Sequence, residues 1–393
     1  MSFRVPRPVV SMSGGHFFID CYASMFGAFL PFLHQQLDLS LAEAGILGGV
    51  LSFSSAFMQP VYGYLADRLR NRVFTALGPG LAGIFISGLG LAPNFWALLV
   101  MVILGGAGIS AFHPQAASMV SESSGRRKGL HMSVFVTTGM LGYALGPVYI
   151  TTVIALVGLG SSLWAGVPGV AMSLYLILYG PSPSQTAALH HRTLLSRLLE
   201  QRKPLLILYL LVVIRGTIQI IFVAFLPFYL TLNGYDESRA ALVLSLFLLA
   251  GGSAGFLGGL LSDRFGGKSV LALSMFGGLP LLLAFLWSQG PISVVLCILG
   301  GAVLLSTSPV NVVMAQQIVP EATSTISALL MGFAWGVGGL LLPLFGWASQ
   351  TVGLQLSMTV IVLLTVPGFV LALKLPPGLG RGGLKATPRL AHE

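Results

Sequence analysis

Four ionisable side chains interrupt the long apolar stretches of this sequence, and their types could carry a proton or hold an anion. They are His16, Asp20, His113 and Arg215. A charge at the centre of a membrane helix costs about 2.5–3.5 kcal/mol on insertion scales, so it persists where it has a partner or faces a watery cavity. These four residues are therefore the first candidates for function.

His16 and Asp20 are four residues apart, so on a helix they share one face. The carboxylate would favour the protonated imidazole, and the imidazolium would favour the ionised carboxylate. Such a pair can take up and release a proton as its access to the two sides of a membrane alternates. A structural hydrogen bond that pins the helix is the alternative.

Metal binding by His16, Asp20 and His113 is a further alternative for the same residues. It is not favoured, because nothing else in the chain supplies a soft ligand. The two cysteines, Cys21 and Cys297, both fall inside apolar stretches and read as small buried residues rather than as a disulfide or a metal pair. We therefore expect no metal and no cofactor.

Arg215 lies near the middle of an apolar stretch that begins at residue 204 (215 − 204 = 11). It could neutralise Asp20 and be displaced when Asp20 gains a proton. It could instead hold an anionic group of a substrate, because guanidinium geometry matches carboxylate or phosphonate. A permanent ion pair that only orders packing is the third possibility. We predict that Asp20 and Arg215 face each other across a central cavity.

Other polar residues accompany these four on the same stretches and on the stretch 291–318. His113 precedes Pro114, which frees a backbone carbonyl near Ser110. His113 could therefore titrate near neutral pH or hydrogen-bond that turn. The residues that we predict to contact a substrate are His113, Gln115, Arg215, Gln219, Asn311 and Gln316.

The composition places these residues in a membrane. Apolar residues make up 55% of the 393 and charged residues 8%, whereas a soluble domain carries about 25% charged residues. Long continuous apolar runs favour helices over a β-barrel. In a soluble protein, a net charge of +9 would suggest binding to nucleic acid. Here the basic residues lie mostly between the apolar spans. No Walker loop or nucleophile–base spacing is present, so we expect neither an enzyme nor an ATP-driven pump.

Twelve stretches are near the ~20 residues that a helix needs to cross a bilayer. They cover 9–33, 43–66, 73–92, 95–120, 129–157, 160–180, 204–230, 240–262, 269–288, 291–318, 323–350 and 354–374. With the N-terminus inside, 18 of the 20 basic residues fall in inner segments, the exceptions being Arg215 and Arg239. This asymmetry predicts a multi-pass protein of the inner (cytoplasmic) membrane with both termini in the cytoplasm.

The sequence repeats itself at an interval of 196 residues. Ala28-Phe-Leu-Pro31-Phe returns as Ala224-Phe-Leu-Pro227-Phe (227 − 31 = 196), and Pro147 aligns with Pro343 (343 − 147 = 196). In an apolar chain, such doubling indicates a two-lobed transporter whose site lies between the lobes. The same interval maps Asp20 to position 216, next to Arg215.

The repeat sets the predicted domain boundaries. We predict an all-α fold of twelve transmembrane helices, with six-helix lobes at 1–180 and 204–375. Residues 181–203 form the cytoplasmic linker, either a short helix on the inner membrane surface or a solvated tether. The tail, 376–393, is rich in Gly, Pro and basic residues and is predicted to be disordered.

A third repeated element lies in an inner loop of each half. Gly63-Tyr-Leu-Ala-Asp67-Arg68 returns as Gly259-Leu-Leu-Ser-Asp263-Arg264 (263 − 67 = 196). It resembles the signature of the major facilitator superfamily between the second and third helices of each half. Ion pairs there could latch one conformation and break in the other; simply holding the loop inside is the alternative. The predicted gating residues are Gly63, Asp67, Arg68, Arg72, Gly259, Asp263 and Arg264.

The run from Gly142 through Gly146 to Pro147 resembles the antiporter signature in the fifth helix of that superfamily. The glycines allow close helix packing, and the proline is predicted to bend the helix because it removes a backbone donor. The superfamily resemblance also implies that the first and fourth helices of each half line the cavity. All four ionisable residues fall on helices of that kind.

The first 150 residues or so resemble the fosmidomycin-resistance-type family of efflux proteins. The matching segments are Ser13-Gly-Gly-His16-Phe-Phe-Ile-Asp20, Gln59-Pro60-Val-Tyr-Gly63, Ala111-Phe-His113-Pro114 and Gly125-Arg126-Arg127-Lys-Gly129-Leu. Two positions depart from that family, which usually has Glu where this chain has Gln115 and Gln where it has Val136. Both departures remove polar or titratable groups.

We predict secondary transport by alternating access, with proton-driven export of a small amphiphilic or anionic compound and with His16 and Asp20 as the proton carriers. The expected partners are a small-molecule substrate, protons and the bilayer, without nucleic acid, and the protein is expected to be a monomer. An uptake symporter for an organic anion is the first alternative, because no motif encodes direction. A transporter-shaped protein that binds a ligand or lipid without moving it is the second.

Overall fold

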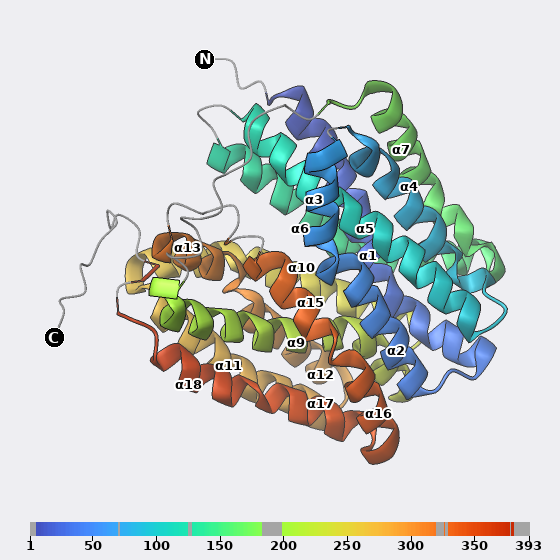
Figure 1. The fold of residues 1–393 in the computed structure, drawn as a ribbon. Coiled ribbons are helices and arrows are strands. Elements are labelled where there is room, and N and C mark those ends of the chain that lie inside the picture. Colours follow the sequence, from blue (N-terminus) through green and yellow to red (C-terminus); the bar gives the residue numbers. More distant parts are fainter. Residues whose placement is uncertain are drawn as a thin grey trace. The chain divides into compact units, whose positions relative to one another are not determined.

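The computed structural model describes residues 5–69, 71–124, 128–182, 199–319, 326, 329–377 and 379–380. This part of the chain is helical and has no strand (Figure 1), so the predicted all-α fold class is confirmed. The helices of the first half are α1 (Arg7–Leu37), α2 (Leu41–Ser52), η1 (Phe53–Phe57), α3 (Gln59–Leu69), α4 (Val73–Ser87), η2 (Gly88–Leu91), α5 (Phe95–Ser123), α6 (Lys128–Val157), η4 (Leu159–Gly166) and α7 (Val167–Tyr179). Those of the second half are α9 (Arg202–Leu232), α10 (Glu237–Phe265), α11 (Gly267–Trp287), α12 (Gly290–Leu305), α13 (Ser308–Ile318), η6 (Leu329–Phe333), α15 (Ala334–Gly339), α16 (Leu342–Val352), α17 (Leu354–Leu363) and α18 (Thr365–Leu373).

Eleven helical stretches among the described residues are long and apolar enough to cross a membrane. They correspond to the predicted spans except the eleventh, 323–350. In that span the structure describes residue 326 and the residues from 329 onward, which form η6, α15 and α16. The remainder of its first turns lies outside the described residues.

The chain forms two compact units that alternate along the sequence. Unit 1 comprises Met1–Ala187, Gln219–Leu249 and Trp335–Met358, and unit 2 comprises Ala188–Ile218, Ala250–Ala334 and Thr359–Glu393. The predicted lobes, 1–180 and 204–375, divide the chain differently and stay a prediction. The middle of the predicted linker and most of the predicted tail, 183–198 and 381–393, lie outside the described residues.

Local capping chemistry fixes where the first helices end and begin. Asp38 adopts a left-handed backbone conformation (φ 50°) that ends α1, which Asp tolerates better than most residues. Two residues later, Ser40 and Glu43 form a capping box at the start of α2, each side chain accepting from the backbone N–H of the other. Asn94 caps α5 in the same way by accepting from the N–H of Ala97 at 3.0 Å.

Glycines bring α6 into backbone contact with α1 inside unit 1. A Cβ atom at Gly142 would overlap the carbonyl oxygen of Phe17, and one at Gly146 would overlap that of Cys21. Both glycines are therefore required by packing, as for small residues at other membrane helix interfaces. Pro147 lies inside α6, which stays helical on both sides of it, and a bend at Pro147 stays a prediction.

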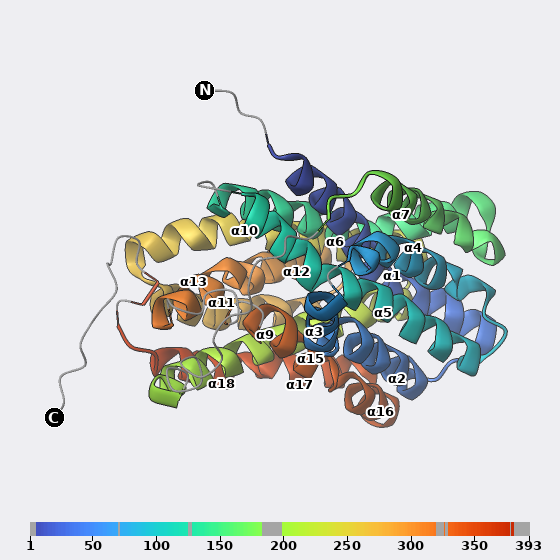
Figure 2. The same ribbon diagram turned by 45° about the horizontal axis from the view of Figure 1, so that its top comes forward.

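Two further close contacts in unit 1 join segments from the two sequence halves. A Cβ at Gly27 of α1 would overlap the carbonyl oxygen of Val223 in α9, and these positions are repeat equivalents (223 − 27 = 196). Likewise, Gly45 of α2 meets the backbone of Gly346 in α16; α2 and α16 lie side by side in both views (Figures 1 and 2). Of the two contacts, only that between Gly27 and Val223 joins equivalent positions, as expected beside an axis that relates the repeats.

The predicted tenth span, 291–318, is interrupted rather than continuous. Inside unit 2, α12 ends at Leu305 and α13 begins at Ser308. Pro309 has no N–H to donate to the carbonyl of Leu305, four residues earlier. The hydroxyl of Ser308 donates to that carbonyl instead, at 2.9 Å. The sequence therefore breaks this helix at a point where a buried polar group can be placed.

Candidate functional site

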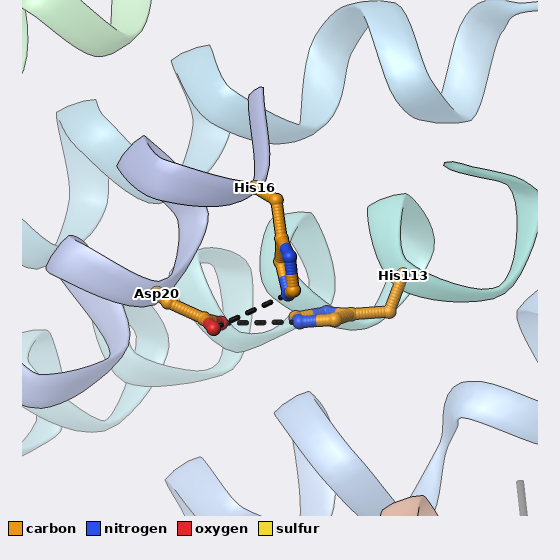
Figure 3. A group of neighbouring side chains, drawn as sticks. All are labelled: His16, Asp20 and His113. Carbon is orange, nitrogen blue, oxygen red and sulfur yellow. Dashed lines mark hydrogen bonds and ion pairs between the residues drawn. The ribbon is translucent and has the colours of Figure 1, made fainter. Parts of the chain in front are cut away.

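The structure brings together three of the predicted residues in unit 1. His16 and Asp20 lie on α1 and His113 on α5, and their side chains point toward one another (Figure 3). Asp20 contacts both rings: its Oδ2 is 3.2 Å from Nε2 of His16, and its Oδ1 is 3.1 Å from Nε2 of His113. We call these three residues the His–Asp–His cluster.

Backbone carbonyls fix the tautomer of both rings. Nδ1 of His16 lies 2.8 Å from the carbonyl oxygen of Phe135, and Nδ1 of His113 lies 2.8 Å from that of Ile109. A carbonyl oxygen can only accept, so each Nδ1 must carry its hydrogen and donate. In the neutral form of either ring, Nε2 then presents a lone pair to Asp20. The carbonyl that His113 contacts is that of Ile109, one residue before Ser110. The predicted hydrogen bond to this turn of α5 is therefore present, together with the contact to Asp20.

This arrangement has a definite proton count. An ionised Asp20 can only accept hydrogen bonds. If both rings were neutral, each short contact would place a lone pair of Nε2 against a lone pair of a carboxylate oxygen, which is repulsive. Each contact becomes a hydrogen bond when one proton lies between its two atoms. With one proton in each contact, the cluster would hold two protons beyond those on the Nδ1 atoms, and together with one carboxylate it would have a net charge of one positive.

The surroundings of the cluster are apolar on one side and accessible on the other. The His16 ring stacks on Phe135, with centroids 4.1 Å apart, and Phe112 lies parallel at 6.5 Å. Gly139 of α6 covers the His16–Asp20 pair so closely that a Cβ there would overlap both side chains. The His16 side chain is 8% exposed, but those of Asp20 and His113 are 19% and 21% exposed. The Asp20–His113 side of the cluster is therefore its more exposed side.

Arg215 occupies a separate buried site in unit 2. Its side chain lies in the interior of that unit, and Nη1 donates to the hydroxyl of Ser308 at 2.5 Å, at the break between α12 and α13. The same hydroxyl donates to Leu305, the last residue of α12. A helix C-terminus carries partial negative charge, so it compensates part of the guanidinium charge. The described ion pairs include none to Arg215.

Unit 2 also contains buried polar atoms without partners, on Arg215 itself and on residues that flank Ser308 along the chain. Among the described residues, Nε of Arg215, Oγ1 of Thr307 and Oδ1 of Asn311 are buried and have no hydrogen-bond partner. Such atoms are rare in folded proteins and require an explanation, such as a ligand. Gln316 lies further along α13 and is half-buried. Arg215 and Asp20 belong to different units, so their predicted pairing stays a prediction.

Two predicted glutamine sites have different environments. Gln219, one turn after Arg215 on α9, is buried, and its Oε1 has no partner among the described residues. Gln115 is also buried, but its amide N donates to the carbonyl of Asn71 at 2.7 Å and its Oε1 accepts from the N–H of Thr75. Gln115 thus holds the connection between α3 and α4, and a substrate contact of this residue stays a prediction.

The first predicted gate is only partly described. Asp67 is in α3, but its side chain lies outside the described residues. Gly63 packs against Pro114 of α5, and Arg68 is exposed. Arg72 instead caps a helix, because its guanidinium donates to the carbonyls of Ile177, at 2.8 Å, and Gly180 at the end of α7.

The second predicted gate lies at the end of α10. Asp263 and Arg264 are both exposed, and Arg264 lies over the ring of Phe265 at 5.2 Å. Nothing lies close to Gly259 where a Cβ would be. The described ion pairs include none at either gate, and a latch that forms in another conformation stays a prediction.

An apolar hollow of about 160 Å³ lies between α3, α4 and α5 of unit 1. Its lining includes Tyr62, Phe74 and Leu77, and none of the predicted site residues contributes to it. It is therefore not a candidate substrate site.

Sequence reasoning missed three residues that define these sites. Phe135 supplies a carbonyl and a stacking ring, but nothing in its residue type marks it. Gly139 could have been found, since it extends the glycine series of Gly142 and Gly146 by one turn of the helix. Ser308 had the clearest signal, because it precedes a proline within the polar run Ser306-Thr307-Ser308 inside an apolar span.

The sequence pattern of the Major Facilitator Superfamily matches residues 12–343. The chain is 28% identical to the Fosmidomycin resistance protein of Escherichia coli (strain K12) over 375 residues, 92% of this chain and 90% of that protein. It is 27% identical to the uncharacterized MFS-type transporter YfnC of Bacillus subtilis (strain 168) over 372 residues, 92% of this chain and 90% of that one. A crystal structure of a bacterial homologue of the human lysosomal transporter Spinster, inward-facing and occupied, is similar in fold, with a TM-score of 0.76 and 18% identity over 93% of this chain and 95% of that one.

The helical fold, the membrane-spanning stretches and the buried polar sites thus define a multi-pass membrane transporter rather than an enzyme. This chain belongs to the Major Facilitator Superfamily.

Proposed function

We propose that this transporter exports a small amphiphilic or anionic compound in exchange for protons, by alternating access. The observation that carries the proposal is the His–Asp–His cluster, whose three side chains require two protons to close. A titratable cluster that is partly accessible and set in an apolar surround can load protons from one side and release them to the other. His16 and Asp20 carry the protons, and His113 completes the pair of contacts.

The substrate side of the proposal rests on unit 2. Arg215 is a buried cation with an unpartnered Nε and one hydroxyl partner, Ser308, and Thr307 and Asn311, which flank Ser308 along the chain, have unpartnered buried oxygens. A guanidinium in that state can take a carboxylate or phosphonate through paired hydrogen bonds. We assign the anionic group to Arg215, with further contacts from His113, Gln115, Gln219, Asn311 and Gln316.

The remaining predictions complete the proposal. The doubled loop elements around Asp67–Arg68 and Asp263–Arg264 act as conformational latches. The protein works as a monomer in the inner membrane with both termini in the cytoplasm, following the distribution of its basic residues. The Fosmidomycin resistance protein is similar to this chain over most of its length, and its name, which denotes drug resistance, supports export over uptake.

A ligand screen followed by a proton-flux assay tests this proposal. Thermal-shift measurements on the purified protein would select ligands from amphiphilic drugs, carboxylates and phosphonates, with fosmidomycin included. The selected ligand would then be added to proteoliposomes that have an acidic lumen and contain a pH-sensitive dye. We expect ligand-dependent alkalinisation of the lumen by the wild type and none by Asp20→Asn. A ligand that binds the wild type but moves no protons would defeat the proposal in favour of a non-transporting binding protein.

Vesicle orientation separates export from the uptake symporter. An exchanger accumulates the ligand in everted vesicles with an acidic lumen, whereas a symporter accumulates it in right-side-out vesicles with an acidic exterior. The control for Asp20→Asn is Asp236→Asn. Asp236 is an exposed carboxylate at the start of α10 that pairs with Arg239, and Asn retains its capping function.

A further inference from the structure

We propose that the His–Asp–His cluster is also a binding site for a divalent transition-metal ion of the Zn²⁺ class. This inference rests on the geometry of the three side chains and does not depend on the proposed function. Two imidazoles and one carboxylate form a ligand set that suits Zn²⁺, Co²⁺ or Ni²⁺. The sequence disfavoured a metal because nothing else in the chain supplies a soft ligand, but the structure adds the tautomers and the spacing of these three residues.

The orientation of the rings carries the argument. Metal-bound histidines almost always donate their second ring N–H to a carbonyl or carboxylate, which turns the other nitrogen toward the metal. Both rings here do so, His16 to the carbonyl of Phe135 and His113 to that of Ile109, each at 2.8 Å. Their Nε2 lone pairs therefore converge on Asp20 before any ion arrives.

The spacing also fits a small ion. Donors about 2.0–2.1 Å from a tetrahedral Zn²⁺ are roughly 3.3 Å apart. Nε2 of His16 is 3.2 Å from Oδ2 of Asp20, Nε2 of His113 is 3.1 Å from its Oδ1, and one donor atom from each of the three residues lies within 4.8 Å of the others. The longest of these separations must shorten on binding, and the partly exposed His113 side chain is the one with room to move. That exposed side also leaves a fourth position for water or a ligand atom.

Histidine binds a metal ion through a neutral imidazole, so the affinity of this site for the ion should rise with pH, as for other sites with histidine ligands.

Binding of Co²⁺ and Zn²⁺ to the purified, tag-free full chain in detergent tests this inference. We expect one Co²⁺ per chain, with the visible absorption of a four-coordinate ion, and its displacement by Zn²⁺. Calorimetry of Zn²⁺ binding in buffers with different ionisation enthalpies should show release of up to two protons at acidic pH and fewer as pH rises. X-ray absorption at the zinc edge should show two imidazoles in the first shell.

Substitutions then locate the site. Asp20→Asn, His16→Gln and His113→Gln should each weaken binding more than about a hundredfold, beyond the 10–100-fold that outer-shell changes cost. The control is His34→Gln, since the His34 ring engages the carbonyl of Leu39 at 2.7 Å and lies outside the cluster; it should leave binding unchanged. Stoichiometric binding that survives in folded His113→Gln, or a zinc spectrum without two imidazoles, overturns the site.

The two proposals fail separately. Metal binding at the cluster without ligand-dependent proton flux would remove the proposed function and leave the metal site. Proton flux that depends on Asp20, without metal binding by the wild type, would remove the metal site and leave the proposed function.

Discussion

At the scale of single residues, free-energy magnitudes indicate that Arg215 is not retained for stability. Burying its charge in a membrane helix costs about 2.5–3.5 kcal/mol. Its hydrogen bond to Ser308, which involves a charged group, returns about 1.5–3 kcal/mol. These contributions nearly cancel, which agrees with the proposal that the charge is retained to bind an anionic ligand.

Arg215→Gln should therefore leave folding nearly unchanged and abolish transport of anionic ligands. We expect a free energy of unfolding within about 1 kcal/mol of the wild type, because the lost bond and the removed burial cost offset each other. Thermal unfolding of the purified variant and ligand uptake into proteoliposomes measure the two effects. Normal transport by Arg215→Gln would contradict an anion-binding role.

His16→Gln tests the proposed contribution of one ring to proton coupling. Glutamine can still donate to the carbonyl of Phe135, but it cannot hold the second proton against Asp20. We expect ligand binding to persist while the number of protons moved per ligand falls. Comparing reversal potentials of wild type and variant in proteoliposomes would show this, and an unchanged ratio would remove His16 from the coupling site.

At the scale of elements, backbone packing between α1 and α6 positions the cluster. Gly139, Gly142 and Gly146 face α1 along three successive turns, and each leaves no space for a Cβ. The run from Gly142 to Pro147 resembles a motif that we predicted to bend α6. In the structure the glycines of this run allow close approach of α6 to α1, and Gly139, one turn earlier, covers His16 and Asp20.

Gly142→Leu should separate α1 from α6 and destabilise the protein. Overpacking costs about 1–3 kcal/mol where side chains can adjust, and here the obstacle is the carbonyl of Phe17 in the backbone of α1. Thermal unfolding should show a lower midpoint than for Leu141→Ala, a change at an exposed position of the same helix. Equal midpoints for the two variants would refute this account of the glycines.

The sequence predicted the elements well and the internal breaks poorly. Long apolar runs located the membrane-spanning stretches because twenty apolar residues leave few alternatives. They did not reveal the interruption at Ser306 and Thr307, because hydropathy is averaged over a window of residues. Pro309 leaves only one backbone carbonyl without its helical donor, which such an average does not detect. The pairing of His16 with Asp20 followed from helical periodicity, whereas the approach of His113 depends on tertiary packing of α1 against α5.

At the scale of the whole molecule, two close contacts in unit 1 join the two sequence halves. Gly27 touches its repeat equivalent Val223, and Gly45 of α2 touches Gly346 of α16, which is not its equivalent. Each contact joins two backbones without an intervening side chain. Contacts of this kind can separate and re-form without repacking side chains, which suits the alternating access proposed above.

Gly45→Trp should prevent the α2–α16 contact and stop transport. A large side chain between two backbones cannot be accommodated, so the conformation described here becomes inaccessible. Spin labels on the exposed positions Ile46 and Leu344 should report a longer separation by pulsed electron resonance in the variant than in the wild type. An unchanged distance distribution, or normal transport, would show that this contact can be dispensed with.

The carbonyls of Phe135 and Ile109 that orient both imidazoles belong to the main chain, and that has a genetic consequence. Every amino acid has a main-chain carbonyl, so no substitution at either position removes the acceptor. The orientation of each ring should therefore tolerate point mutations there. Random mutagenesis that selects for uncoupled protein should therefore recover hits in the three cluster codons and in the codon for Gly139, while Phe135 and Ile109 accept other apolar residues.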